Sequence, residues 1–403
     1  RMSSPGLAHA FGRGAAAQGA DVISAGLGST DLLYYASGSL DIPGAMFTAS
    51  HNPAQYNGIK MCHAGAKPVG METGLTEIRE LATAGVPAHD GPAGTVSTRD
   101  LLSGYAEHLK TLVDLSGIRL LKVVVDAGNG MGGHTVPAVF AGLPIDLVPM
   151  YFELDGTFPN HEANPIEAAN IADLRVAVRE HGADVGLAFD GDADRCFVVD
   201  ERGEPVAPST VTALVAVREL DRLGAGRIVH NLITSRSVPE IVREHGGEPI
   251  RTRVGHSFIK QTMAETGAMF GGEHSGHYYF RDFWFADSGM LAAMHVLAAL
   301  GGQDGPLSEL LAGFTRYAAS GEINSKVADQ ATAMAEVRSA FEGRPGVTAD
   351  ELDGLTVSHD DWWFNLRASN TEPLLRLNAE AGDQATMTDV RDEVLDIVRK
   401  GNA

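Results

Sequence analysis

The sequence has few of the features that mark secreted, membrane-spanning or nucleic-acid-binding proteins. Cys62 and Cys196 are the only cysteines in 403 residues, which excludes a disulfide framework and indicates a reducing compartment. No apolar run reaches about 18 residues, and the longest helical candidate, residues 290–300, is interrupted by His295. The amino end lacks the apolar core of a signal peptide. We therefore expect a soluble cytoplasmic protein.

Basic residues are scarce as well. Lys and Arg number 31 against 52 Asp and Glu, which gives a formal net charge of −21. Nucleic acid and anionic membranes repel such a chain, so we expect neither as a partner. An anionic substrate would need a local basic site that works against the field of the whole protein.

Apolar runs typical of strands alternate with stretches that carry apolar residues at helical spacing. The predicted strands are 21–25, 45–48, 120–126, 185–189, 227–232 and 269–271, and the predicted helices include 168–181, 209–223 and 237–244. This alternation predicts parallel sheets with helices on both faces, in three α/β units of one plan. Residues 85–98, rich in glycine, alanine and proline, predict a surface loop in the first unit.

The pattern changes near residue 323 to that of an α+β unit. The predicted elements there are a helix at 331–341, strands at 362–366 and 374–377, and a closing helix at 386–400. Polar or glycine-rich joints are predicted at 112–117, 223–226 and 318–322. The chain is large enough for several cores, and the predicted domains are 1–114, 115–223, 224–320 and 321–403.

The most informative motif is Asp-Gly-Asp-Ala-Asp-Arg at residues 190–195, which lies between two apolar stretches. It occupies the carboxyl end of a predicted buried strand, where α/β sheets place their ligand sites. Three carboxylates at alternate positions can turn toward one cation. Oxygen ligands suit Mg²⁺, whose remaining positions go to water or phosphate oxygens. The motif therefore predicts phosphoryl chemistry.

Three other interpretations of this motif stay open on the sequence alone. The aspartates and Glu201 match positions one, three, five and twelve of a calcium loop, although position six is Arg195 where that loop needs glycine. A phosphatase could use Asp190 as its nucleophile. A solvated acidic turn, neutralised by Arg195, would bind nothing.

A second motif, Thr-Ala-Ser-His-Asn-Pro at residues 48–53, places Ser50 in a tight loop after a predicted strand. A serine hydroxyl alone is a poor nucleophile. Either His51 activates it, or the serine carries a phosphoryl group and donates it. The structural alternative is a turn stabilised by hydrogen bonds of the Ser50 and Asn52 side chains.

Two further loops carry groups suited to a sugar phosphate. The run Gly-Glu-His-Ser-Gly-His at 272–277 places Glu273 and Ser275 on one face, where they suit two neighbouring hydroxyls. The run Arg-Ala-Ser-Asn-Thr-Glu-Pro at 367–373 can surround a phosphate with a guanidinium, hydroxyls and backbone amides. Either loop could be purely structural, and the pair Gly255-His256 is a weaker signal still.

Taken in order, these motifs resemble those of the α-D-phosphohexomutase superfamily, and within it the bacterial phosphomannomutase/phosphoglucomutase group. The resemblance covers the whole chain. It implies three topologically similar α/β domains with mostly parallel mixed sheets and a C-terminal α+β domain, in a heart-shaped protein with a central active-site cleft. It also implies an intramolecular phosphotransferase that interconverts mannose 1-phosphate and mannose 6-phosphate, and glucose phosphates as well. The reaction would pass through a phosphoserine and a hexose 1,6-bisphosphate that reorients in the site and also acts as activator.

The resemblance further implies roles for single residues. One Mg²⁺ would be bound by Ser50, the phosphoserine, together with Asp190, Asp192 and Asp194. Catalysis would use Ser50, His51, Lys60 and His277, with His277 as the general acid/base. Substrate would be bound by Arg195, His256, Glu273, Ser275, Arg367, Ser369, Asn370 and Thr371.

Details of the motifs favour hexoses over amino sugars, because Asn370 follows Ser369 where phosphoglucosamine mutases usually have glycine. We expect small hexose phosphates as partners and a monomer or weak homo-oligomer. Relatives carry an opening segment with a strand before the point where this chain begins, so an incomplete first sheet is expected.

Overall fold

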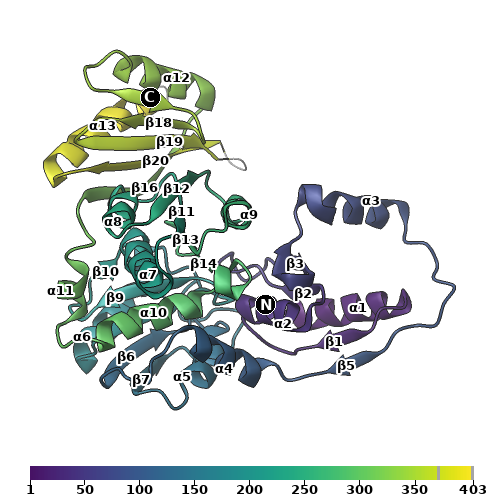
Figure 1. Ribbon diagram of the computed structural model, residues 1–403. Helices are drawn as coiled ribbons and strands as arrows, with labels where there is room; N and C mark the ends of the chain where they lie inside the picture. Colours follow the sequence, from purple (N-terminus) through teal and green to yellow (C-terminus); the bar gives the residue numbers. More distant parts are fainter. Residues whose placement is uncertain (370–372, 401–403) are drawn as a thin grey trace.

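The computed structural model describes residues 1–369 and 373–400, which form four units arranged around an arc (Figure 1). The predicted site residues Asn370 and Thr371 lie outside the described residues. Both cysteines are buried and unpaired. Among the residues described, we find no helix with the length and apolarity needed to cross a membrane.

The second and third units have the same sheet plan. In spatial order the second sheet contains β7 (Ile145–Met150), β6 (Leu121–Asp126), β8 (Val185–Phe189), β9 (Cys196–Asp200) and β10 (Pro205–Val206). The third contains β12 (Glu248–Thr252), β11 (Arg227–Asn231), β13 (Phe270–Gly272), β14 (Tyr278–Phe280) and β15 (Ala286–Asp287). In each, the first three strands are parallel and the last two antiparallel. The prediction of similar α/β units with mostly parallel mixed sheets is confirmed for these two.

Helices cover both faces of these sheets. One large core is shared by α4 (Leu102–Leu112), α5 (Gly132–Phe140), α7 (Pro208–Leu223), α8 (Ser237–Glu244) and α10 (Gly289–Gly301). The opposite faces pack against α6 (Ala172–His181) in the second unit and α9 (His256–Thr266) in the third. Shorter helical segments are η1 (Ala64–Ala66), η2 (Met71–Leu75), η3 (Ala168–Ile171), η4 (Arg281–Phe283) and α11 (Leu307–Leu311).

The first unit has a divided sheet. Its helices are α1 (Ser4–Ala17), α2 (Thr30–Leu40) and α3 (Thr76–Ala84). Its strands are β1 (Val22–Ser24) paired in parallel with β5 (Val96–Thr98), and the antiparallel set β2 (Gly44–Phe47), β3 (Ile59–His63) and β4 (Lys67–Pro68). In the second unit β6 lies between β7 and β8, and in the third unit β11 lies between β12 and β13. In the first unit, no described residue forms a strand between β1 and β2.

The prediction of a surface loop at 85–98 is wrong for its last three residues, 96–98, which form β5. All three residues of β5 are exposed, so the segment has no alternating apolar pattern, and its pairing with β1 decides its conformation. The rest of that loop crosses from α3 to β5 as the long connection at the edge of the first unit (Figure 1).

The fourth unit is one antiparallel sheet with two helices. In spatial order its strands are β16 (Ala318–Lys326), β20 (Leu374–Ala381), β19 (Trp362–Ala368), β18 (Leu355–Ser358) and β17 (Thr348–Asp350), and its helices are α12 (Gln330–Phe341) and α13 (Gln384–Arg399). The α+β prediction is confirmed. Strand β16 runs through the predicted joint at 318–322, with an irregularity at Gly321, whose φ is +67°.

Candidate active site

Three loops from three units meet around the aspartate motif. The turn at 190–195 connects β8 to β9, and its aspartates are buried, with Asp190 and Asp194 fully inaccessible. The backbone of Arg195 pairs with that of His277 in an isolated bridge, which joins this turn to the loop between β13 and β14. Strands flank the turn where a calcium loop has helices, which argues against the calcium alternative.

Ser50 lies against this turn although 140 residues separate it from Asp190. Its Oγ donates to Asp190 Oδ2 at 2.5 Å and lies 3.2 Å from His51 Nδ1. Arg195 Nη2 donates to the same Oγ at 3.4 Å. Ser50 itself has a φ of +47°, and a Cβ at Gly191 would lie 2.6 Å from its carbonyl oxygen. The glycine in the aspartate motif therefore permits the close approach of the serine loop.

The aspartate oxygens fit a divalent cation. Asp190, Asp192 and Asp194 each offer an oxygen within 4.8 Å of the others. The Oδ1 atoms of Asp192 and Asp194 are buried and form no hydrogen bond with any described residue. Since buried polar atoms are nearly always paired, these oxygens suit a hard cation that accepts oxygen ligands only.

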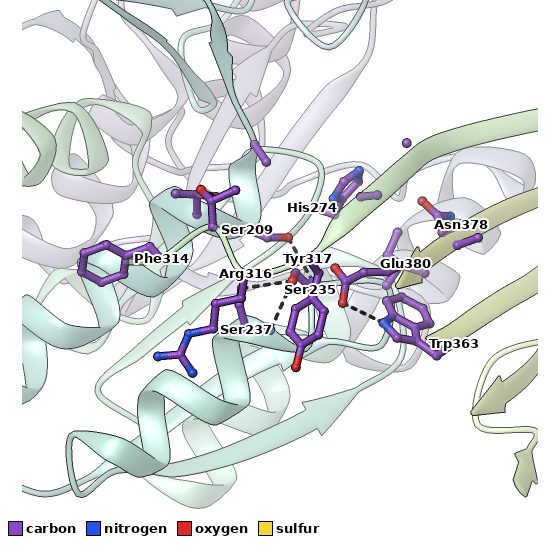
Figure 2. Close-up of a pocket in the computed structure, with 17 residues that line it drawn as sticks. Ser209, Ser235, Ser237, His274, Phe314, Arg316, Tyr317, Trp363, Asn378 and Glu380 are labelled. Carbon is purple, nitrogen blue, oxygen red and sulfur yellow. Dashed lines mark hydrogen bonds between the residues drawn. The ribbon is translucent and has the colours of Figure 1, made fainter. Parts of the chain in front are cut away.

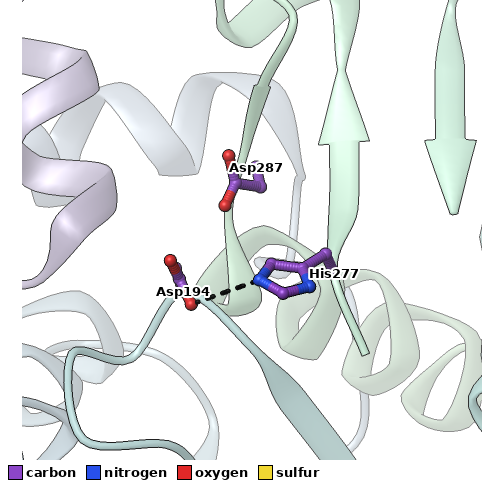
Figure 3. Close-up of side chains that lie close together, drawn as sticks. All are labelled: Asp194, His277 and Asp287. Atoms are coloured by element: carbon purple, nitrogen blue, oxygen red, sulfur yellow. Dashed lines mark ion pairs between the residues drawn. The ribbon is translucent and has the colours of Figure 1, made fainter. Parts of the chain in front are cut away.

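A second group of possible ligands lies beside the first. Asp194, His277 and Asp287 each point an atom toward a common centre, and His277 Nε2 lies 3.7 Å from Asp194 Oδ1 (Figure 3). Asp287, however, forms a buried ion pair with Lys260 at 2.6 Å. Its charge is thus already compensated, which makes this group a poorer cation site than the aspartate triplet.

Charges in the site are strongly coupled. Burial raises the pKa of the Asp190 carboxyl to about 7, because the Arg195 guanidinium only partly offsets the loss of water. Lys60 Nζ lies 2.9 Å from Asp192 Oδ2 and also pairs with Asp194. Burial disfavours the ammonium, but the two aspartates outweigh it and raise the pKa of Lys60. Lys60 is therefore a fixed positive charge beside the triplet.

The pKa of His51 shifts in the direction opposite to that of Lys60. Loss of water contact, with the Arg195 guanidinium nearby, lowers the pKa of its imidazole. The ring is then neutral near pH 7, and one of its nitrogens can accept a proton.

The loop between β13 and β14 supplies a buried carboxylate with many partners. Glu273 Oε2 accepts from Tyr279 Oη at 2.7 Å and from Ser275 Oγ at 3.4 Å. Its Oε1 accepts from the Gly255 N–H at 3.2 Å. His277 Nδ1 lies 3.0 Å from Ser275 Oγ. Glu273 and Ser275 thus share one side of the loop, next to His277.

The remaining predicted residues belong to α9 and to the fourth unit. His256 is exposed at the first position of α9. Arg367, at the end of β19, pairs with Glu322 at 2.9 Å, and the Ser369 N–H bonds to the Leu374 carbonyl across a hairpin. Among the described residues, no hydrogen bond or ion pair links Arg367 to Ser50 or to the aspartates. The serine, aspartate and Glu273 loops therefore meet in the structure. Arg367 lies on the fourth unit, at the end of β19.

Sequence reasoning missed two residues that hold this site. Thr30 Oγ1 donates to Asp192 Oδ2 at 2.7 Å, and the Thr30 N–H bonds to the Asp192 carbonyl. The Arg1 guanidinium donates to the carbonyls of Ser50, Asn52 and Pro53 at 2.5, 2.6 and 3.1 Å. Neither residue belongs to a recognisable motif, so only the three-dimensional contacts reveal them.

Comparison with known proteins gives a consistent result along the chain. Family models described as phosphoglucomutase/phosphomannomutase alpha/beta/alpha domains I, II and III match residues 1–86, 103–203 and 208–317, and the model of the C-terminal domain matches 322–397. The chain is 39% identical to a phosphomannomutase of Salmonella montevideo, over 99% of this chain and 89% of the relative. It is also 39% identical to phosphohexose mutases of Xanthomonas campestris pv. campestris, over 100% and 90%.

A solved structure supports the same likeness. The phosphoglucomutase/phosphomannomutase family protein of Burkholderia thailandensis superposes with a TM-score of 0.86 at 30% identity. The match covers 100% of this chain and 88% of that one.

Proposed function

Because this chain belongs to the phosphoglucomutase/phosphomannomutase family and is a phosphohexomutase, we propose that it interconverts mannose 1-phosphate and mannose 6-phosphate, and also accepts glucose phosphates. Relatives named phosphomannomutase support the choice of mannose. The observation that carries the chemistry is the 2.5 Å contact between Ser50 Oγ and Asp190 Oδ2, which places the serine beside the buried triplet.

Asp190, Asp192, Asp194 and the Ser50 side chain would hold one Mg²⁺. When bound, the ion neutralises negative charge on the phosphoryl group during transfer. The Oδ1 atoms of Asp192 and Asp194, which accept no hydrogen bond from a described residue, support this assignment, and the triplet offers oxygen ligands only.

In the forward half-reaction, phosphorylated Ser50 donates its phosphoryl group to the free hydroxyl of a hexose monophosphate. The bond between phosphorus and Ser50 Oγ breaks as the bond to the sugar oxygen forms, and Ser50 Oγ takes up a proton from solvent as it leaves. The proton of the sugar hydroxyl moves to a base, which returns it to the released sugar oxygen in the second half-reaction. His277 is the proposed base, since Ser275 orients its ring at 3.0 Å. Lys60 supplies positive charge, and Arg195 lies beside the serine oxygen.

The resulting hexose 1,6-bisphosphate reorients and returns its other phosphoryl group to Ser50. The serine proton then needs an acceptor, and neutral His51 lies 3.2 Å from Ser50 Oγ. Glu273 and Ser275 would hold two neighbouring sugar hydroxyls in either orientation of the sugar. His256, Arg367 and Ser369, with the predicted Asn370 and Thr371, would bind the phosphate that is not reacting, at either end of the sugar.

Mass spectrometry of the purified protein tests this proposal. We expect a phosphoryl group on Ser50 after incubation with a hexose 1,6-bisphosphate, and mutase turnover that requires a trace of that activator. The variant Ser50→Ala should lose both the modification and the turnover.

The aspartyl-nucleophile phosphatase gives the opposite result. It would release inorganic phosphate, keep its activity in Ser50→Ala and lose it in Asp190→Asn. That outcome would refute the phosphoserine route. The cytoplasmic location, the oligomeric state and the domain boundaries at 114, 223 and 320 stay predictions.

A further inference from the structure

Two successive peptide groups before α9 bond to carboxylates of different units. The Gly255 N–H donates to Glu273 Oε1 in the third unit at 3.2 Å. The Val254 N–H donates to Asp353 Oδ2 in the fourth unit at 3.0 Å. We propose that Asp353 is a positioning residue that sets Arg367 at a fixed place relative to Glu273, so that the bisphosphate stays bound while it reorients. This inference rests on the proposed function.

The Asp353 turn is tied to the strand that ends in the Arg367 loop. The Asp353 carbonyl accepts from Asn365 Nδ2 at 3.0 Å, and Asn365 lies two residues before Arg367 on β19. Gly354 has a φ of +72°, and a Cβ there would lie 2.6 Å from Arg367 Cβ. Only glycine permits this approach of turn and strand. A short chain of contacts thus runs from Arg367 through Asp353 to the peptide beside Gly255.

The same peptide segment leads into one predicted substrate residue, His256, and bonds to another, Glu273. Gly255 is the residue before α9, and His256 is the first residue of that helix. Glu273, the acceptor of the Gly255 N–H, is buried. A displacement of the Val254–Gly255 segment therefore moves His256 and removes a hydrogen bond from Glu273 at the same time.

Further polar contacts and a small cavity lie between the third and fourth units. Glu380 Oε1 accepts from the Arg236 N–H and from Trp363 Nε1, each at 2.9 Å. Beside it lies a cavity of about 60 Å³ lined by residues of both units (Figure 2). His274 and Asn378 line this cavity, and His274 Nδ1 and Asn378 Nδ2 have no hydrogen-bond partner among the described residues.

Such interfaces within a chain allow the domains to move relative to each other. The polar contacts that join the fourth unit to the third include those of Glu380 with Arg236 and of Asp353 with Val254. The hydrogen bond of Asp353 is made with the Val254 N–H, next to the peptide group that bonds to Glu273.

Without the Asp353 carboxylate, we expect the bisphosphate intermediate to dissociate from the enzyme more often, while the rate of phosphoryl transfer stays the same. Ser50, Lys60 and His277 lie on the first and third units and make no contact with Asp353 in the described structure. A bisphosphate held at one end by Arg367 and at the other by Ser50 and its neighbours would dissociate more often if the fourth unit rotated. Each escape leaves an unphosphorylated enzyme, which needs added bisphosphate to resume turnover.

The interface offers a matched control. Arg251 pairs with Asp350 at 2.9 Å across the same boundary, and both side chains are substantially exposed, by 36% and 44%. An exposed pair of this kind contributes little to stability. Asp350→Ala therefore removes a carboxylate and an interdomain contact from the same face, together with the bond that Asp350 Oδ1 accepts from the Leu352 N–H, and it keeps the carboxylate that bonds to the Val254 peptide.

The test measures the concentration of glucose 1,6-bisphosphate that gives half the maximal mutase rate. For Asp353→Ala in the full chain we expect this concentration to rise about tenfold, the effect of one hydrogen bond to a charged group, with the rate at saturating bisphosphate within about twofold of wild type. Asp353→Asn, whose amide oxygen still accepts, should recover most of the effect. Asp350→Ala should behave as wild type.

An unchanged requirement for bisphosphate in Asp353→Ala would overturn the inference, and so would an equal change in Asp350→Ala. The proposed function is tested separately by wild type: if it shows no phosphorylated Ser50 and no mutase turnover, that proposal fails irrespective of Asp353. Thermal unfolding of each variant shows whether the fold is retained.

Discussion

The first three units and the fourth hold opposite sides of the proposed site in different ways. One continuous core runs through the first three and includes Leu32, Val125 and Phe270, one from each unit. The fourth unit has a separate core around Phe364. The serine, aspartate and Glu273 loops are therefore held by shared packing, whereas the Arg367 loop belongs to a body attached through polar contacts. From this comparison we propose that the chemistry needs rigid distances and that Arg367, the proposed phosphate anchor, tolerates adjustment.

A buried polar cluster strengthens the first of these two regions. Asp31, at the start of α2, accepts from Tyr105 Oη at 2.6 Å and from Ser288 Oγ at 2.7 Å, and it also pairs with Ser29. Ser288 in turn caps α10 by accepting from the Leu291 N–H. This cluster ties the first unit to the third through completely buried atoms, unlike the partly open boundary beside the cavity of Figure 2.

The largest expected effect tests whether the two cores are independent. Phe364→Ala removes a fully buried ring whose centroid lies 4.9 Å from that of Phe341. We expect this change to lower the free energy of unfolding of the fourth unit by about 4 kcal/mol. In calorimetry the transition of the fourth unit should move down while that of the other units stays. Phe270→Ala, a matched change in the shared core, should do the reverse. A single transition shifted by both variants would show that the cores unfold together.

Replacing Lys60 tests the rigid side. Lys60→Ala removes the cation beside Asp192 and Asp194, so we expect kcat to fall by about 10²- to 10³-fold with little change in KM. Steady-state kinetics of the purified variant provide the measurement. Lys110→Ala, which removes a surface pair with Glu107, is the control and should leave kcat unchanged. A rise in KM with unchanged kcat would instead show that Lys60 binds the substrate and the transition state equally well.

Replacing Arg367 tests the adjustable side. Arg367→Ala should lower kcat/KM by about 100-fold, mainly through KM, because a charge-assisted contact to the substrate phosphate is lost. Arg367→Lys should recover part of this, since an ammonium keeps the charge but not the two parallel hydrogen bonds. Arg376→Ala removes another partner of Glu322 and serves as the control. If kcat falls while KM is unchanged, Arg367 acts on the chemical step and the comparison fails.

The smallest effect concerns the pH dependence of the buried cluster. Burial raises the pKa of Asp31 from 3.8 to about 6. Between these values the folded protein binds more protons than the unfolded chain, so the free energy of unfolding falls as pH rises through this window. Asp31→Asn removes that titration. Relative to wild type, the variant should gain about 2 kcal/mol between about pH 4 and pH 7, measured by urea unfolding in EDTA. Parallel pH profiles of the two proteins would contradict this.

Local patterns were sufficient to predict many elements. The strand at 185–189 and the helix at 237–244 have the predicted limits, because a continuous apolar run and a clear helical spacing define them within a few residues. The strand at 96–98 was missed because its side chains are exposed and the strand it pairs with, β1, lies more than 70 residues earlier. The strand through 318–322 was missed because Gly321 suggests a break, whereas pairing with β20 continues on both sides of it.

For the site, the sequence alone determined which chemical groups are present and in which loops, because turn residues, strand ends and ligand spacing are local properties. Tertiary structure decided which of those loops touch. Packing of the shared core brings Ser50 to Asp190 across 140 residues, and a polar boundary brings Asp353 to Val254 across 99. Contacts at such separations depend on how whole units pack, and no local pattern encodes that geometry.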